Sequence, residues 1–67
     1  MNLGNRIRDV RLLRGLTQQS LAQAVGVTRQ TIIAVEKGTT RPSVELALRL
    51  AHVLGTPLPE LFWLEDK

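Results

Sequence analysis

Apolar residues recur along the chain at the spacing of amphipathic helices, in segments set apart by glycine and proline. The first segment places Leu3, Ile7 and Val10 on one stripe. The second and third segments each follow a threonine, which can cap a helix, and each ends at a glycine, which can stop one. The pattern predicts three short helices, over residues 4–14, 18–25 and 29–37.

The remaining spacing predicts two more helices. Ser43 is a suitable cap for the fourth helix, whose expected core stripe consists of Val44, Ala47, Leu48, Ala51 and Leu54. Pro57 begins a short fifth helix, which carries the apolar residues Leu58, Leu61 and Phe62. The residues after Trp63 are a candidate for a short terminal β-strand against Met1 to Leu3. We therefore expect an all-α fold, with residues 1–67 forming one compact five-helix domain.

The size and composition of the chain narrow the function. A domain of 67 residues has a small core, and such domains usually add disulfides, a metal or a second subunit. The chain has no cysteine and a single histidine, His52, so self-association is the remaining route. The sequence also offers no nucleophile with its base and no paired acid and base. We expect no enzymatic activity, no metal and no cofactor.

Two further patterns concern location. No apolar run approaches the length of a membrane span. The residues that follow Met1 also lack the apolar stretch of a signal peptide. With no export signal and no cysteine, the expected location is the cytoplasm.

The net charge of +3 is unevenly distributed along the chain. Residues 1–41 hold seven basic and two acidic side chains, whereas residues 42–67 hold two basic and four acidic ones. This division suggests that the basic part of the chain binds a polyanion and that the acidic part faces a different partner. Ordinary solvent-exposed charge explains the distribution equally well, so charge alone does not decide between these two interpretations.

A very short turn joins the second and third predicted helices. Ala22 is small enough to let the helices cross closely, and Gly26 permits the sharp reversal between them. An apolar wedge then fixes the interhelical angle: Val25, Val27, Ile32 and Val35. This spacing indicates a helix-turn-helix unit able to insert its second helix into a DNA major groove. A plain helical hairpin would show the same spacing, and that alternative stays open.

The outward face of the third predicted helix favours DNA binding. Its first turn is polar throughout: Thr28, Arg29, Gln30 and Thr31. Arginine can pair with guanine O6 and N7, and glutamine can pair with adenine N6 and N7. Ile33 and Ala34 lie further along, where an apolar group can contact a thymine methyl. Gln18 opens the preceding helix, whose N-terminal amides can bind a phosphate.

Together these features resemble the phage repressor/Cro-type (XRE) helix-turn-helix family over nearly the whole chain. The matching motifs are IRDVR (7–11), GLTQQSLA (15–22), VGVTRQTI (25–32) and EKG (36–38). Two C-terminal motifs resemble the subgroup of short free-standing bacterial regulators: PSVELAL (42–48) and LGTPLPELF (54–62). The resemblance implies a lambda-repressor-like DNA-binding domain.

The resemblance also implies roles for individual residues. Base contacts are expected from Thr28, Arg29, Gln30, Thr31, Ile33 and Ala34, with the arginine and the glutamine as the main readers. Three phosphate contacts are expected: Gln18, Lys37 and Arg41. Arg11 and Glu36 match a pair that joins the first helix to the end of the third in many relatives, and we expect a structural role for it.

The chain departs from the family pattern at two places. Ile33 and Ala34 occupy positions that are often polar in relatives, so either specificity rests more heavily on the first turn or methyl contacts replace hydrogen bonds. Leu12 and Leu13 stand where relatives usually have charged residues. They either complete the core or form an exposed patch whose use the sequence does not reveal.

A dimer interface is expected at the C-terminal end of the chain. Apolar residues lie off the expected core stripe or beyond the last helix: Leu46, Leu50, Val53, Phe62, Trp63 and Leu64. Exposed apolar side chains that cluster usually mark an interface, and the short regulators of the family pair through this region. An alternative is that Trp63 only covers the core of one copy.

The expected function is that of a sequence-specific repressor, binding a palindromic operator on double-stranded DNA as a homodimer. An activator or a restriction-modification controller is open as well, because one DNA-bound dimer can recruit or block RNA polymerase. Contact with RNA polymerase is therefore a further candidate interaction. The rival class is an antitoxin or adaptor that acts mainly through a protein partner.

Overall fold

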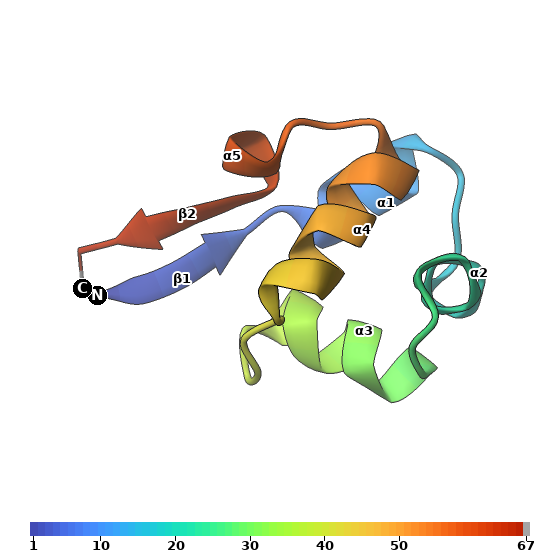
Figure 1. Ribbon diagram of the computed structural model, residues 1–67, viewed down its shortest axis with the longest axis horizontal. Coiled ribbons are helices and arrows are strands. Elements are labelled where there is room, and N and C mark those ends of the chain that lie inside the picture. Colours follow the sequence, from blue (N-terminus) through green and yellow to red (C-terminus); the bar gives the residue numbers. More distant parts are fainter. Residues whose placement is uncertain (67) are drawn as a thin grey trace.

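The computed structural model describes residues 1–66 and is mostly helical (Figure 1). The elements in chain order are β1 (Asn2–Asn5), α1 (Ile7–Leu13), α2 (Gln18–Val25), α3 (Arg29–Lys37), α4 (Val44–Leu54), α5 (Leu58–Leu61) and β2 (Phe62–Glu65). The five helices of residues 1–66 form one cluster, from which the two strands project to one side, with both ends of the described chain at their tip (Figure 1). The five-helix expectation is confirmed, and so is the short terminal strand. Among the described helices none is long and apolar enough to cross a membrane.

The first helix starts later than the sequence pattern predicts, at Ile7 instead of Gly4. Asn5 ends β1, and its side-chain Oδ1 accepts a hydrogen bond from the backbone N–H of Ile7 at 3.1 Å. This local bond satisfies a backbone donor that a helix leaves free in its first turn. Leu3, expected on the stripe of the first helix, lies in β1 instead.

The two strands pair in antiparallel register, with Gly4 opposite Trp63. The pairing is so close that a Cβ atom at Gly4 would overlap the indole of Trp63 and the carboxylate of Glu65. The guanidinium of Arg6 lies 5.1 Å from the centre of the same indole ring. Position 4 therefore requires a glycine, because the Trp63 ring lies across the backbone of β1 there.

The core is built where the helices converge and is apolar apart from one arginine. Its buried apolar side chains are Ile7, Val10, Leu21, Ala22, Val25, Ile32, Val35, Leu46, Leu50, Leu54 and Leu61. Phe62, expected at the end of the fifth helix, instead begins β2 and packs against this core from its edge. The α5 helix ends at Leu61, which is fully buried.

The predicted core stripe of α4 is right for Leu54 and for Ala51, which packs against the core, and wrong for Val44 and Leu48. Leu46, Leu50 and Leu54 face the core, whereas Val44 and Leu48 are 75% and 54% exposed. The helix carries apolar residues on much of its surface, so periodicity admits more than one buried face. The observed face carries leucines at positions i, i+4 and i+8, which bury more apolar area than the mixed stripe with two alanines.

This assignment of the α4 face is testable by a matched pair of substitutions. Leu50→Ala removes a fully buried side chain and should lower the free energy of unfolding by about 2–5 kcal/mol. Leu48→Ala removes an exposed one and should change it by less than about 1 kcal/mol. Urea unfolding at one protein concentration measures both. A larger loss from Leu48→Ala would show that α4 presents the opposite face to the core.

Candidate nucleic-acid interface

Helices α2 and α3 each begin at a capping threonine. The Thr17 hydroxyl accepts from the backbone N–H of Ser20 at 3.0 Å, and the Ser20 hydroxyl in return accepts from the Thr17 backbone N–H at 2.9 Å. Thr28 caps α3 by accepting from the backbone N–H of Thr31 at 3.3 Å. These caps fix where each helix starts, and therefore which residues of α3 form its first turn.

The turn between α2 and α3 has the geometry that its sequence predicts. Gly26 adopts the left-handed conformation, with φ of 77°, and the backbone N–H of Val27 donates to the Ala22 carbonyl at 3.0 Å. Ala22 has no exposed surface, and Val25 and Ile32 are buried beside it. A Cβ at position 26 would be strained by that φ and would also lie 3.2 Å from a guanidinium nitrogen of Arg49. Gly26 is thus essential to the reversal.

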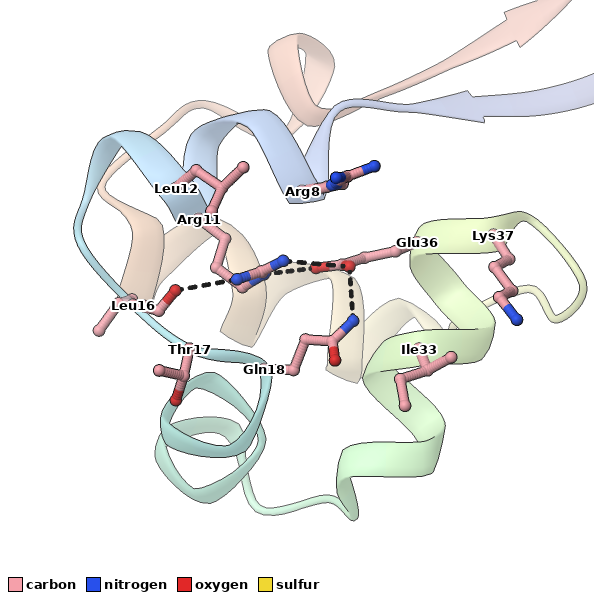
Figure 2. Close-up of a pocket in the computed structure, with 9 residues that line it drawn as sticks. All are labelled: Arg8, Arg11, Leu12, Leu16, Thr17, Gln18, Ile33, Glu36 and Lys37. Atoms are coloured by element: carbon pink, nitrogen blue, oxygen red, sulfur yellow. Dashed lines mark hydrogen bonds and ion pairs between the residues drawn. The ribbon is translucent and has the colours of Figure 1, made fainter.

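A buried polar network joins α1, α2 and α3 (Figure 2). Arg11 Nε donates to Glu36 Oε2 at 2.7 Å, and these two side chains are only 9% and 6% exposed. Arg11 Nη1 also donates to the Leu16 carbonyl at 3.0 Å, and Gln18 Nε2 donates to Glu36 Oε1 at 3.1 Å. The carboxylate of Glu36 is therefore bonded on both oxygens. One residue of α3 is held at once by α1 and by the first residue of α2.

The first turn of α3 faces outward. Thr28, Arg29 and Gln30 are exposed, and Thr31 is half-buried with its hydroxyl 3.1 Å from that of Thr28. Within residues 1–66 neither Arg29 nor Gln30 has a hydrogen-bonding or ionic partner from its side chain. The guanidinium of Arg29 and the amide of Gln30 are therefore open to solvent. Both belong to the first turn of α3, which Thr28 caps.

The residues further along α3 are less open. Ile33 and Ala34 are half-buried, and Lys37 is exposed at the helix end. Ile33 lies one turn beyond Arg29 and one turn before Lys37, so these three side chains share one face of the helix. Ile33 and Lys37 line a groove of about 500 Å³ between α3, α1 and the start of α2.

Arg41, expected to contact phosphate, lies in the loop after α3 and is exposed. This loop passes beside β1, because Arg41 lines a small hollow together with Leu3 and Asn5. Asn5 secures the same region by donating from Nδ2 to the Val35 carbonyl at 3.0 Å. Arg41 therefore lies at the far end of α3 from Arg29.

Two residues of the expected dimer interface are misassigned. Leu46 and Leu50 are buried in the core because they face inward from α4, so they cannot form a surface in the folded chain. Val53 and Phe62 are half-buried against the core, Trp63 is half-buried in β2, and Leu64 is 69% exposed. Only the last three residues remain together at one surface.

Arg8 also lies at this interface, and the sequence pattern alone assigns it no role. The side chain lies one turn before Arg11 on α1 and lines the same groove as Gln18 and Lys37 (Figure 2). The signal was available, because a residue three positions from one that packs between two helices shares its side of the helix. The resemblance assigns it no role, since the matching motif offers Arg11 as the residue with a partner.

The buried network generates a stability prediction. Arg11→Met leaves the Glu36 carboxylate buried with no cation, which should cost about 3–5 kcal/mol of unfolding free energy. Replacing both partners, Arg11→Met with Glu36→Met, should recover most of that loss, because two apolar side chains need no compensation. Urea unfolding measures both.

The control for this prediction is the exposed ion pair between Glu45 and Arg49 on α4, with side chains 73% and 55% exposed. Glu45→Gln should change stability by less than about 1 kcal/mol. An Arg11→Met loss no greater than this control would mean that the buried pair does not hold the helices together.

Comparison with other proteins agrees with the geometry. A helix-turn-helix family model matches residues 7–61. An uncharacterized HTH-type transcriptional regulator of Methanocaldococcus jannaschii is 45% identical over 62 residues, covering 92% of this chain and 94% of that protein. The cryptic phage CTXphi transcriptional repressor RstR of Vibrio cholerae is 42% identical over 57 residues, covering 85% of this chain and 51% of RstR.

Solved structures share the fold. The restriction-modification controller protein C.AhdI from Aeromonas hydrophila superposes with a TM-score of 0.76 and 33% identity, covering 81% of this chain and 82% of that chain. The clp gene regulator ClgR from C. glutamicum gives 0.72 and 31%, covering 78% of this chain and 68% of that chain. The chain belongs to the XRE/Cro-C1-type helix-turn-helix family, and it is a DNA-binding transcriptional regulator and not an enzyme.

Proposed function

We propose that this regulator is a repressor that binds a palindromic operator as a homodimer, with α3 of each copy in a major groove. The observation that carries the proposal is the start of α3. Arg29 and Gln30 are exposed and engaged by no other side chain of residues 1–66, on a helix that the Arg11–Glu36 pair holds in place. Base recognition requires a rigid helix whose polar side chains have no other partner.

The chemistry of the first turn suits bidentate recognition. The planar guanidinium of Arg29 can donate to O6 and N7 of one guanine, and the amide of Gln30 can pair with N6 and N7 of one adenine. Thr28 and Thr31 would be divided between bases and backbone. Ile33 and Ala34 are half-buried, so their part in base contact would be limited to the methyl group of a thymine.

Phosphate contacts would position the helix without reading sequence. Gln18 donates one amide hydrogen to Glu36, and its second amide hydrogen is left for a phosphate oxygen. Lys37 and Arg41 are exposed at and beyond the end of α3, where a cation can meet the DNA backbone. All three residues would therefore contact the DNA backbone near the C-terminal end of α3.

One relative supports repression as the direction of regulation. RstR, 42% identical to this chain, is named a transcriptional repressor. C.AhdI, 33% identical, is a controller protein, which keeps activation open as the alternative. The position of the operator relative to a promoter would decide between the two, because the same dimer can exclude or recruit RNA polymerase.

The dimer would form through a shallow apolar groove, here called the sheet groove. It has a volume of about 340 Å³ and is lined by Leu3, Pro42, Ser43, Val44, Ala47, Leu58, Pro59, Phe62, Trp63 and Leu64. Val44 and Leu64 are 75% and 69% exposed, an unusual placement for two large apolar side chains beside one groove. A second copy related by two-fold symmetry would cover both. This groove replaces Leu46 and Leu50 in the expected interface.

A two-fold dimer would also match the DNA. Two copies joined at one surface present two α3 helices with a fixed separation, and an operator with half-sites one helical turn apart needs a separation of about 34 Å. The sheet groove lies on α4, α5 and the two strands and includes no residue of α3. Pairing there would therefore leave both first turns free for bases.

The experiment that tests the proposal is selection from random duplex DNA, followed by binding of the selected sequences at two salt concentrations. An enriched palindrome with strongly salt-dependent binding is the expected result. Absence of enrichment at both salt concentrations would sink the repressor proposal and move the function to a protein partner, in the manner of an antitoxin or adaptor.

Single substitutions on α3 should change specificity. Arg29→Ala or Gln30→Ala should weaken cognate binding by about 1–3 kcal/mol and relax the preference at one base position of each half-site. Fluorescence anisotropy with cognate and single-base-variant duplexes measures both effects. The control is His52→Ala, at an exposed position on α4. An equal loss on cognate and random DNA would reassign the side chain to phosphate contact.

Dimerisation is best tested at Leu64, because Trp63 lies over Gly4 and its removal would also disturb the pairing of β1 with β2. Leu64→Lys should shift the dimer towards monomer by at least tenfold in dissociation constant, since a lysine would have to be buried at the interface. Sedimentation equilibrium gives the constant. Leu13→Lys makes the same change at a residue that is 82% exposed on α1 and should leave it unchanged. A dimer unaffected by Leu64→Lys would place the interface elsewhere.

A further inference from the structure

The side chain of Asn5 makes two hydrogen bonds that join separate parts of the fold. Its Oδ1 accepts from the backbone N–H of Ile7 at 3.1 Å, and its Nδ2 donates to the Val35 carbonyl at 3.0 Å. The first bond is local, whereas the second links residues that are 30 positions apart in the sequence. The amide of Asn5 therefore attaches the end of β1 to the last turn of α3, away from the first turn that reads bases.

We infer that Asn5 is a positioning residue for the reading helix. It sets the angle between α3 and the dimer surface, and thereby the spacing between half-sites that the protein accepts. The inference rests on the dimeric repressor proposed above and adds to it a residue that links its two surfaces. Asn5 acts through α3 and needs no contact of its own with DNA.

The sheet connects Asn5 to the proposed dimer surface. Asn5 lies opposite Phe62 in the register of β1 and β2, and the backbone N–H of Arg6 donates to the Leu61 carbonyl at 3.0 Å. Phe62 lines the sheet groove, through which the two copies would pair. The end of β1 is therefore bonded directly to the segment that carries this part of the groove.

Apolar packing alone does not secure the last turn of α3 against β1. A hollow of about 120 Å³ lies between them, and both Asn5 and Val35 line it. A hollow has few atoms in contact across it, so it transmits position poorly. The bond from Nδ2 to the Val35 carbonyl has direction and joins two residues of this lining. It therefore fixes a distance where packing is incomplete.

The network around Glu36 holds α3 in a different way. Glu36 is bonded to Arg11 of α1 and to Gln18 of α2, and these bonds reach neither strand. They fix the reading helix within one copy, whereas the bond from Asn5 relates it to the surface where two copies would meet. The core shared by the helices relates the two surfaces as well. Loss of the Asn5 bond should therefore loosen this relation without abolishing it.

Half-site spacing is the property that reports this angle. One base pair added between two half-sites moves them about 3.4 Å apart and turns one against the other by about 34°. A dimer with firmly held reading helices loses contacts on the altered operator, whereas a dimer whose helices can turn retains them. The affinity for the selected operator divided by that for the altered one, here called the spacing ratio, therefore measures how firmly α3 is held.

The test compares Asn5 variants on the selected operator, on the operator with one added base pair and on a single half-site. Asn5→Asp keeps the acceptor for the Ile7 N–H and removes the hydrogens that the Val35 carbonyl accepts. Asn5→Ser keeps a local acceptor without a charge and has no atom at the position of Nδ2. Both should lower the spacing ratio by about fivefold, as the loss of one hydrogen bond predicts. Affinity for the single half-site and the dimer dissociation constant should stay unchanged.

The matched control is Thr39→Val. Thr39 Oγ1 donates to the Ala34 carbonyl at 3.2 Å, also in the last turn of α3, but from the loop that follows the helix. The substitution removes this bond with little change of shape and should leave the spacing ratio unchanged, because β1 is not involved. Thermal unfolding confirms that each variant is folded.

The possible outcomes separate this inference from the proposed function. An unaltered spacing ratio in Asn5→Asp and Asn5→Ser overturns the inference, and so does an equal decrease in Thr39→Val. A parallel loss of affinity on all three duplexes also overturns it, because that is the effect of a purely structural role. A wild-type protein that binds the single half-site as well as the operator, or binds no DNA, would instead overturn the proposed function.

Discussion

A single carboxylate, that of Glu36, receives hydrogen bonds from α1 through Arg11 and from the start of α2 through Gln18. Three helices that meet through apolar contact alone could slide or rotate by small amounts, because apolar contact has no direction. Hydrogen bonds between a guanidinium, a carboxylate and an amide do have direction. These bonds therefore help to fix the angle at which α3 is presented.

The network also explains how so small a core can support an exposed binding surface. Residues that contact DNA must stay polar and solvated, so they contribute little to the stability of the fold. In this chain the inward side of α3 contributes Ile32 and Val35 to the core and Glu36 to the network. Its outward side is then left for Arg29 and Gln30. The two roles of α3 are separated around the helix, and neither weakens the other.

Sequence reasoning predicts the helix-turn-helix unit well and the C-terminal half less well. The α2–α3 unit is specified by local rules, since capping threonines, a left-handed glycine and a small alanine each fix one detail of the backbone. The position of α4 has no such local determinant. Leu46 and Val44 are both plausible core residues from periodicity, and only the packing of α4 against α2 and α5 selects the former. The groove beside Arg8 could not be predicted for the same reason, since it depends on how distant helices approach.

The pairing of β1 with β2 brings the two ends of the described chain side by side (Figure 1). Because the strands are antiparallel and the ends lie at the same tip, a pull on them would load the interstrand hydrogen bonds one pair at a time. Such unzipping meets much less mechanical resistance than shearing all pairs together. The indole of Trp63 over Gly4 would be an early contact to break, well before the helical core is reached.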